Sequence, residues 1–261
     1  MLNVTGLTVK YGSLSVITDL AFSLEPGSFT ALLGANGTGK SSLLKGIAGV
    51  IPASGGVSLQ DRKNLQPHQR GDSIAYMPQD TGATSSLTVI EVILLGRLRS
   101  LGMQVPRSLE NEAISILSGF GLGALETRTL EEISGGQRQL VYLAQSLFRN
   151  PDILLLDEPT AALDLRHQLI VLDRVSSHCR KNGTIAIAAM HDLSLAAKCA
   201  DRLICMSDGK IVADGKPTEV LSVSLIRDLY GVEADLVTGS NGILHITPLN
   251  AVELEKTVSP V

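Results

Sequence analysis

The stretch Leu32 to Ser42, LLGANGTGKSS, gathers glycine, lysine and hydroxyl side chains in one short segment. Residues 34–41 fit the pattern G-x-x-x-x-G-K-[ST] at every fixed position. Glycines let backbone N–H groups surround phosphate oxygens, Lys40 can reach the terminal phosphates, and the Ser41 hydroxyl can bind Mg²⁺. A glycine-rich turn could match by chance, but a strand pattern before it and a helix pattern after it favour a phosphate loop. We expect it to bind a nucleoside triphosphate through Gly34, Ala35, Asn36, Gly37, Thr38, Gly39, Lys40, Ser41 and Ser42.

An acidic pair, Asp157 and Glu158, follows the apolar run ILLL in the segment ILLLDEPT. In an open α/β sheet, ligands bind at the edge where the strands have their carboxyl ends. We therefore expect Asp157 to bind Mg²⁺ through water beside the glycine loop, and Glu158 to polarise an attacking water as general base. A solvated acidic turn is the alternative, and it loses weight because the apolar run directs the pair to that edge.

The segment ISGGQRQLVYLAQSLF joins a glycine turn to an amphipathic helix. A helix N-terminus of this kind is suited to an anion. The one phosphate loop of this chain would already bind the nucleotide of the chain, so this second anion site would need another phosphate. The phosphate could belong to ATP held by a second subunit, or the turn could be a simple helix cap, and the residues alone favour neither.

The elements that must position these groups alternate between strand and helix patterns. Strand patterns occupy residues 2–33, 56–59, 73–77, 153–157 and 184–190, and helix patterns occupy 40–49, 137–148 and 163–181. The later strands are continuous apolar runs, which is typical of a parallel sheet covered by helices on both faces. We predict an α/β fold with a P-loop NTPase core, antiparallel strands near the N-terminus, a helical insertion at about residues 80–135, and a C-terminal extension of helix and strands at 216–261.

Composition restricts the classes of function. The chain has 261 residues, 44% apolar and 18% charged, with a net charge of −4, as an ordinary globular protein has. The negative charge and low aromatic content disfavour nucleic-acid binding. We expect a reduced cytosolic protein, because the N-terminus lacks signal-peptide order, the apolar runs are too short to span a membrane, and three cysteines do not suggest a disulfide framework.

Four motifs in a fixed order identify a family. They are GANGTGKSS, ISGGQRQ, ILLLDEPTAALD and the histidine of AAMHDL. Together they resemble the ATP-binding subunit of ABC transporters over roughly residues 2–248. The resemblance implies a single ATPase cassette that uses ATP and Mg²⁺, and a head-to-tail homodimer enclosing two ATP molecules. In that dimer the segment after Ile133 contacts ATP bound by the other subunit, through Ser134, Gly135, Gly136 and Gln137.

The resemblance also assigns roles to single residues. Tyr11 in VKYGS resembles the aromatic residue that stacks on adenine, and Gln79 in YMPQD the glutamine that senses Mg²⁺ and water. His191 resembles the histidine that contacts the γ-phosphate, and Asp164 in AALD lies in the loop that signals across the dimer. Ala161 stands where a hydroxyl or amide side chain is usual, which puts some hydrogen bonding across the dimer in doubt.

Several stretches resemble one group within that family. TVIEVILLGR, AALDLRHQLIVLDRV and the ending LIRDLYGVEADLVTGSNGILHITPL look like subunits that power import of iron–siderophore complexes, haem and vitamin B12. However, LRSLG follows where that group commonly has an aromatic or histidine-containing stretch. The expected function is ATP hydrolysis that drives import of such a metal chelate, and import of another small substrate is the alternative.

The resemblance implies partners as well. We expect an integral membrane permease, an extracytoplasmic substrate-binding protein that acts indirectly, and a location on the cytoplasmic face of the cell membrane. Gln79 and the helices from Asp80 to about residue 99 are expected to form a groove for a permease helix. The reason is the apolar face Val89, Val92, Ile93 and Leu94 beside the Gln79 loop. The rivals are a soluble ABC ATPase acting on nucleic acid or ribosomes, a P-loop kinase or GTPase, and a regulatory ATP-binding module. They lack support because no coiled-coil insertion, second cassette or guanine-reading motif is present, and because Glu158 and His191 are both retained.

Overall fold

A six-stranded sheet forms the centre of the computed structural model, which describes residues 1–59, 65–79, 85–98, 105–240 and 242–252. Its strands lie in the order β5-β6-β7-β3-β8-β9. They are β3 (Phe29–Leu33), β5 (Ile74–Met77), β6 (Ile153–Asp157), β7 (Ile185–Ala189), β8 (Arg202–Ser207) and β9 (Lys210–Gly215). Neighbouring strands pair in parallel, except that β9 runs antiparallel to β8. The five strands from β5 to β8 in this order therefore end at the same edge.

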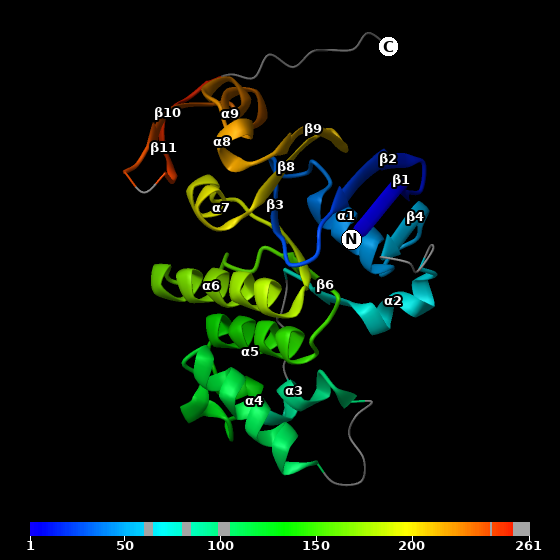
Figure 1. The fold of residues 1–261 in the computed structure, drawn as a ribbon, viewed down its shortest axis with the longest axis vertical. Coiled ribbons are helices and arrows are strands. Elements are labelled where there is room, and N and C mark those ends of the chain that lie inside the picture. The colour runs from blue at the N-terminus through cyan, green and yellow to red at the C-terminus, as the bar shows by residue number, and fades with distance from the viewer. Residues whose placement is uncertain (60–64, 80–84, 99–104, 241, 253–261) are drawn as a thin grey trace.

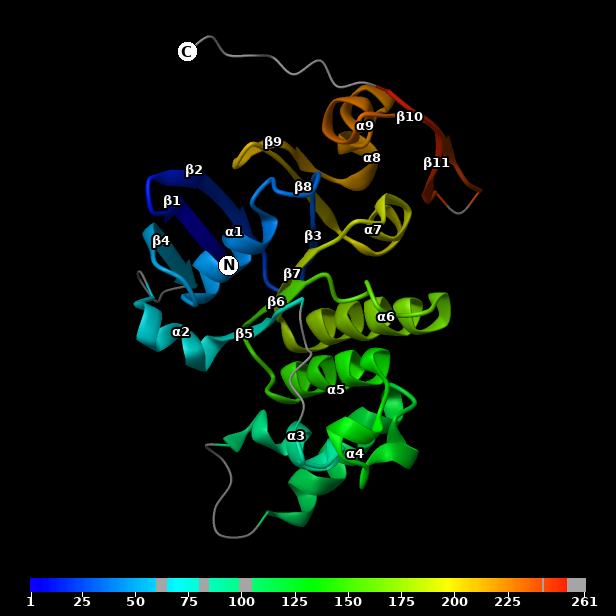
Figure 2. The same ribbon diagram turned by 180° about the vertical axis from the view of Figure 1, so that it is seen from behind.

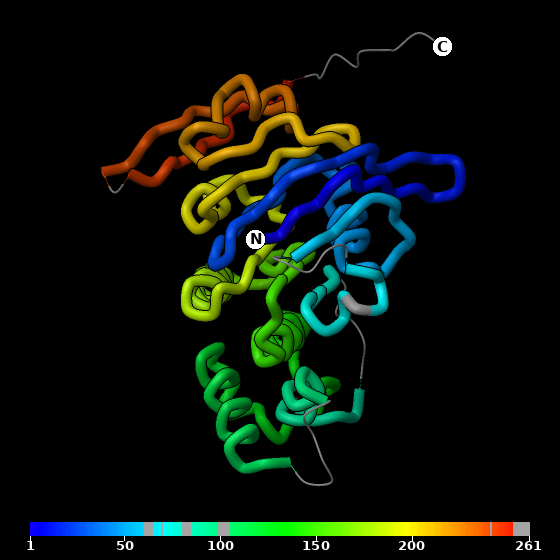
Figure 3. The backbone as a smooth tube through the Cα atoms, turned by 45° about the vertical axis from the view of Figure 1, so that its right-hand side comes forward, coloured from blue at the N-terminus to red at the C-terminus, as the bar shows by residue number. Residues whose placement is uncertain are grey.

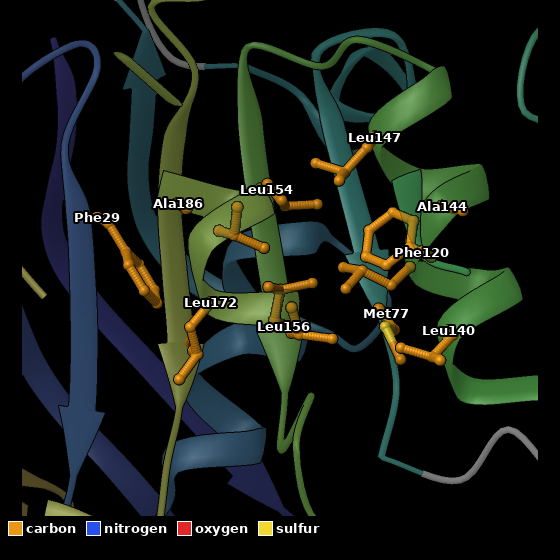
Figure 4. Close-up of a cluster of buried hydrophobic side chains, with 14 of the residues drawn as sticks. Phe29, Met77, Phe120, Leu140, Ala144, Leu147, Leu154, Leu156, Leu172 and Ala186 are labelled. Carbon is orange, nitrogen blue, oxygen red and sulfur yellow. The ribbon is translucent and has the colours of Figure 1, made fainter. Parts of the chain in front are cut away.

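Helices cover both faces of this sheet. The helix α1 (Lys40–Ala48) packs on one face, and α5 (Gly135–Phe148), α6 (Leu165–Asn182) and α7 (Leu193–Cys199) lie on the other. Successive residues of a strand point to opposite faces, so Ile153 and Leu155 of β6 join the cluster with α1. Leu154 and Leu156 face α5 instead, as Figure 4 shows. Burial on both sides explains why these strands are apolar throughout.

The first strands form a separate antiparallel sheet over α1. It has the order β2-β1-β4, from β1 (Leu2–Tyr11), β2 (Leu14–Leu24) and β4 (Ala53–Leu59). One face of β1 is buried through Leu2, Val4, Leu7 and Val9, and it belongs to the cluster that contains α1. The strand β2 lies beside β9 of the central sheet (Figure 3). A short helix, α2 (Pro67–Ser73), precedes β5.

Between β5 and α5 the described chain is helical, with α3 (Val89–Leu95), α4 (Arg107–Gly119) and two 3₁₀ turns, η2 (Gly123–Leu125) and η3 (Leu130–Glu132). These elements lie at the lower end of the molecule in Figures 1 and 2 and pack on α5. The apolar face that motivated the expected permease groove, Val89, Val92, Ile93 and Leu94, is at most 9% exposed, so these four side chains do not form the surface of a groove. They pack into the central cluster with α5.

The chain ends in a small layer at the opposite end of the molecule (Figure 1). It comprises α8 (Pro217–Val220), α9 (Val223–Tyr230) and a hairpin of β10 (Val232–Thr238) and β11 (Leu244–Ala251). The helix α9 packs on β10, and α7 of the core packs on β11. This layer therefore lies directly against the element that follows His191.

The predicted fold class is confirmed, and the helix over residues 40–49 ends one residue early, where Gly49 adopts φ +75° as its cap. The sequence patterns did not identify β8 and β9. These strands form the last parallel pair and the antiparallel edge, and β9 alternates only between exposed and half-buried residues. Among the helices that the structure describes, none is long and apolar enough to cross a membrane.

Candidate functional site

The loop between β3 and α1 can be built only with glycine at two of its positions. Gly34 has φ +147°, and a Cβ there would lie 2.4 Å from the carbonyl oxygen of Met206. Gly39 has φ +99°, and its Cβ would lie 2.7 Å from the Ile17 side chain. At both positions the backbone has a conformation that residues with a side chain rarely adopt, and it lies close to other segments of the same chain. The core and the N-terminal sheet thus set the shape of this loop.

Lys40 begins α1 and is almost entirely buried, with 6% of the residue exposed. Its Nζ donates hydrogen bonds to the carbonyl oxygens of Gly34 (2.7 Å) and Ala35 (3.0 Å). Burial lowers the pKa of Lys40, while the nearby carboxylates of Glu158 and Asp157 act in the opposite direction. The first turn of α1 has no side-chain cap and no acidic residue, so its N–H groups and this ammonium face the same space. That combination suits a polyanion.

Asp157 at the end of β6 faces the start of α1. The Ser41 hydroxyl donates to Asp157 Oδ1 (2.9 Å), and the Tyr76 hydroxyl donates to Oδ2 (3.2 Å). Burial and the Asp157 charge raise the pKa of Tyr76 well above its ordinary value, so it remains a donor. A hydroxyl and a carboxylate are hard oxygen ligands of the kind Mg²⁺ prefers, usually together with substrate phosphates. The described residues contain no cluster of three acidic, histidine or cysteine side chains that would hold a metal by itself.

Glu158 holds its carboxylate between two partners from neighbouring strands. Gln79, after β5, donates from Nε2 to Oε2 (2.8 Å), and His191, after β7, lies with Nε2 2.5 Å from Oε1. The backbone of Glu158 has φ +53°, which is rare for a residue with a side chain. Such conformations persist when the surroundings over-determine them, and they concentrate at functional sites.

These groups line one cavity of about 570 Å³ at the carboxyl edge of the sheet. Its walls are Val16, Asn36, Gly37, Gly39, Lys40, Ser41, Ser42, Gln79, Glu158 and His191. Tyr11 lies at its border, about half exposed, with its hydroxyl 3.4 Å from Ser42 Oγ. The structure thus brings together the phosphate loop, the acidic pair, Gln79 and His191, which are far apart in the sequence.

The segment Ser134–Gln137 is not part of this cavity. Ser134 caps α5 by accepting from the Gln137 N–H (3.2 Å), and the Gln137 side chain accepts from the Ser134 N–H (2.9 Å). Ser134 and Gly135 are exposed. Asp164 is exposed too, and it caps α6 by accepting from the His167 N–H. The structure thus shows the helix cap, and within the described part of the chain no side chain accepts from the Gly135 or Gly136 N–H, so the cap leaves room for the second hypothesis, an anion at this N-terminus.

Three further residues support the site without having been predicted. Tyr76 contacts Asp157, and Tyr230 at the end of α9 accepts the Gly34 N–H at 2.9 Å. Gln139 on α5 donates to the backbone carbonyl of Glu158 at 3.0 Å. Tyr76 could have been noticed because it alternates with buried residues in a strand that ends beside Gln79. Tyr230 and Gln139 carry no local signal, since their partners lie far away in the chain.

A comparison with family models matches residues 17–161 to the ABC transporter family. That range contains the phosphate loop, Gln79, the start of α5 and the acidic pair. It also covers more than half of the chain.

Comparisons with curated proteins and solved structures agree with this match. The chain is 36% identical to a phosphonates import ATP-binding protein of Rhodopseudomonas palustris (strain BisB5), covering 92% of this chain and 93% of the relative. It is 35% identical to a hemin import ATP-binding protein of R. palustris (strain BisB18), covering 91% and 90%. It also superposes on a metal-chelate type ABC transporter in an inward-facing conformation with a TM-score of 0.79 and 25% identity, covering 95% and 97%.

Tyr230→Phe tests the tie between the C-terminal layer and the phosphate loop. Burial raises the pKa of Tyr230 to about 12, so the phenol stays protonated and its oxygen accepts the Gly34 N–H. Removing that oxygen leaves a part-buried N–H unpaired, and we expect the free energy of unfolding to fall by about 1–3 kcal/mol. Urea unfolding measures this, with Tyr11→Phe as the control at an exposed tyrosine. Equal stability of the two variants would contradict the role of Tyr230.

Proposed function

This chain belongs to the ABC transporter family and is the ATPase of an importer, and on that premise we propose that its cargo is a metal chelate of the iron–siderophore, haem or cobalamin type. We further propose that it acts with Mg²⁺, as a homodimer, at the cytoplasmic face of a membrane permease. The observation that supports ATP hydrolysis is one cavity in which the phosphate loop faces Gln79, Glu158 and His191. Membership of the family supports the role in transport.

ATP is proposed to bind with its phosphates in the loop and its base at the border of the cavity. The N–H groups of residues 34–42 would surround the phosphate oxygens, and Lys40 would exchange its bonds to Gly34 and Ala35 for bonds to the terminal phosphates. Tyr11 would stack on adenine, which its exposed position beside Ser42 allows. The proposal needs only a side-chain movement of Lys40, because its ammonium already lies within the loop.

Glu158 is proposed as the general base for hydrolysis. Its carboxylate would accept a proton from water as the water oxygen bonds to the γ-phosphorus and the bond to the ADP oxygen breaks. Gln79 and His191 hold that carboxylate from both sides, and His191 would turn its Nε2 toward the γ-phosphate once ATP is present. Ser41, Asp157 and Gln79 would hold Mg²⁺, which supplies positive charge beside the phosphates.

A second copy of the chain is proposed to complete each site. Ser134, Gly135, Gly136 and Gln137 lie outside this chain's own cavity, at an exposed helix N-terminus suited to phosphate. In a head-to-tail dimer they would contact ATP held by the other subunit, and Asp164 would lie between the sites. The permease is proposed to dock near α3, where Leu87, Leu95 and Leu98 are exposed. Asp80, the expected start of that surface, lies outside the described residues.

The cargo can be tested in proteoliposomes that contain this chain, its permease and its substrate-binding protein. We expect hemin, a ferric siderophore or cobalamin, added with the binding protein, to stimulate ATP hydrolysis several-fold. A phosphonate is the matched comparison, because one relative imports phosphonates and is as similar to this chain as the hemin importer. Stimulation by the phosphonate alone would overturn the metal-chelate proposal and leave the ATPase intact.

Lys40→Ala should abolish measurable ATP binding. Among the described residues that line the cavity, Lys40 is the only lysine, and a lost charge-assisted contact costs about 1.5–3 kcal/mol before the loop rearranges. Calorimetric titration of ATP with Mg²⁺ measures the affinity. Lys45→Ala, one turn further along α1 and not part of the cavity, is the matched control and should bind as the parent does. Unchanged affinity in Lys40→Ala would refute this placement of the phosphates.

Glu158→Gln should bind ATP as the parent does and hydrolyse it about 10²–10⁴-fold more slowly, because the proton acceptor is lost while size and shape remain. Uncleaved ATP would keep bridging two subunits, so the variant should accumulate as an ATP-dependent dimer in light scattering. Adding Ser134→Arg should break that dimer, and Glu110→Gln on the exposed face of α4 is the control. A parental hydrolysis rate would exclude Glu158 as the base, and an ATP-bound monomer would exclude the composite site.

A further inference from the structure

Gln139 is a buried polar residue that touches the backbone of the proposed base. The residue is 4% exposed, and its Nε2 donates to the Glu158 carbonyl oxygen at 3.0 Å. Its Oε1 is buried and has no hydrogen-bond partner within the part of the chain that the structure describes. The opposite orientation of the amide would set oxygen against oxygen. The bond to Glu158 is therefore the interaction that determines how this side chain lies.

The Glu158 backbone needs such support. A residue with a side chain at φ +53° has a strained backbone, and its surroundings must offset that strain. The Glu158 N–H donates to the Ala189 carbonyl of β7 at 3.2 Å, which holds the residue from the sheet side. Gln139 holds its carbonyl from the α5 side. Without Gln139, the Glu158 carbonyl oxygen would keep, among the described residues, one hydrogen bond, the turn bond that it accepts from the Ala161 N–H at 3.3 Å.

The N-terminus of the same helix is the proposed contact with the partner's nucleotide. The helix α5 begins after its cap Ser134, and Gln139 lies five residues further, about 7.5 Å along the axis. A second contact joins the same two segments, because a Cβ on Gly136 would lie 3.1 Å from the Ala162 carbonyl oxygen. A shift of the first turns of α5 would therefore move the segment that carries Glu158.

We propose that Gln139 is a positioning residue, which makes the geometry of Glu158 in one ATP site depend on whether α5 of the same chain is engaged by the partner's ATP. The proposal rests on the proposed dimer and on the proposed base. It gives each chain a direct route by which occupancy of one site prepares the other for hydrolysis. Binding of ATP to the phosphate loop itself does not involve Gln139.

The chain provides a matched control on the same helix. Gln145 also donates from Nε2 to a backbone carbonyl, that of Val92 in α3, at 2.7 Å. It belongs to α5, has the same side chain and makes the same kind of bond, but its partner lies away from the cavity. A purely structural role for buried glutamines on α5 would affect both positions alike.

The test compares Gln139→Met with Gln145→Met in the purified full chain. We expect Gln139→Met to lower kcat about 10–100-fold, the range that follows from a misplaced catalytic group, with the ATP dissociation constant within about twofold of the parent. The Hill coefficient for ATP hydrolysis should fall toward 1. Gln145→Met should keep the parental kcat and Hill coefficient. Equal effects of the two substitutions, or a parental kcat in Gln139→Met, would overturn the proposal.

A second measurement separates positioning from damage to the fold. In the Glu158→Gln background, Gln139→Met should change the residual hydrolysis rate by less than about twofold, because the group that it positions is gone. The ATP-dependent dimer of Glu158→Gln should still form. Independent, multiplicative losses or a lost dimer would show that Gln139 acts elsewhere. If Gln139→Met does not fold, Gln139→Asn, whose shorter amide cannot span the same distance, replaces it under the same criteria.

The design also separates this inference from the function on which it rests. If Glu158→Gln hydrolyses ATP at the parental rate, the proposed base is wrong and the inference falls with it. If Glu158→Gln is inactive while Gln139→Met and Gln145→Met are both parental, the base stands and only the role of Gln139 is refuted.

Discussion

The parallel pairing of β5, β6, β7 and β3 is the constraint on which the site depends. Each strand ends at the same edge, and each is followed by one contributor: Gln79 after β5, Glu158 after β6, His191 after β7 and the phosphate loop after β3. A shift in register would move a strand end by about one residue, or roughly 3.3 Å. The hydrogen bonds from Gln79 and His191 to one carboxylate would not survive such a shift.

Lys40, Glu158 and Asp157 place opposite charges close together at the cavity. Lys40 is buried beside two carboxylates, which oppose the lowering of its pKa that burial causes. Its hydrogen bonds to loop carbonyls are ones that phosphate oxygens can replace. The same ammonium therefore stabilises the loop and offers its donors to the proposed phosphate oxygens, so that binding would need little reorganisation.

The sequence predicted the parts of the site that follow from strand ends and helix starts. Glycine spacing identified the phosphate loop, and apolar runs before Asp157 and His191 indicated the edge at which they would meet. Long-range support could not be predicted, because Tyr230 and Gln139 bond to Gly34 and Glu158 through tertiary packing that no local pattern encodes. The periodicity of α3 indicated an apolar face, but it could not indicate that α5 and its neighbours cover Val89, Val92, Ile93 and Leu94.

The proposed composite site divides its parts between two surfaces of one chain. The cavity holds the phosphate loop, the proposed base and the proposed metal ligands, and the α5 N-terminus offers N–H groups that no side chain of the described residues accepts from. The proposed twofold pairing of identical chains would complete both halves together, because each surface would then meet its complement twice. Within each chain, Gln139 ties the backbone of Glu158 to the helix that reaches across. In the proposed dimer, two sites built in this way would share a structural element, and the state of one would bear on the geometry of the other.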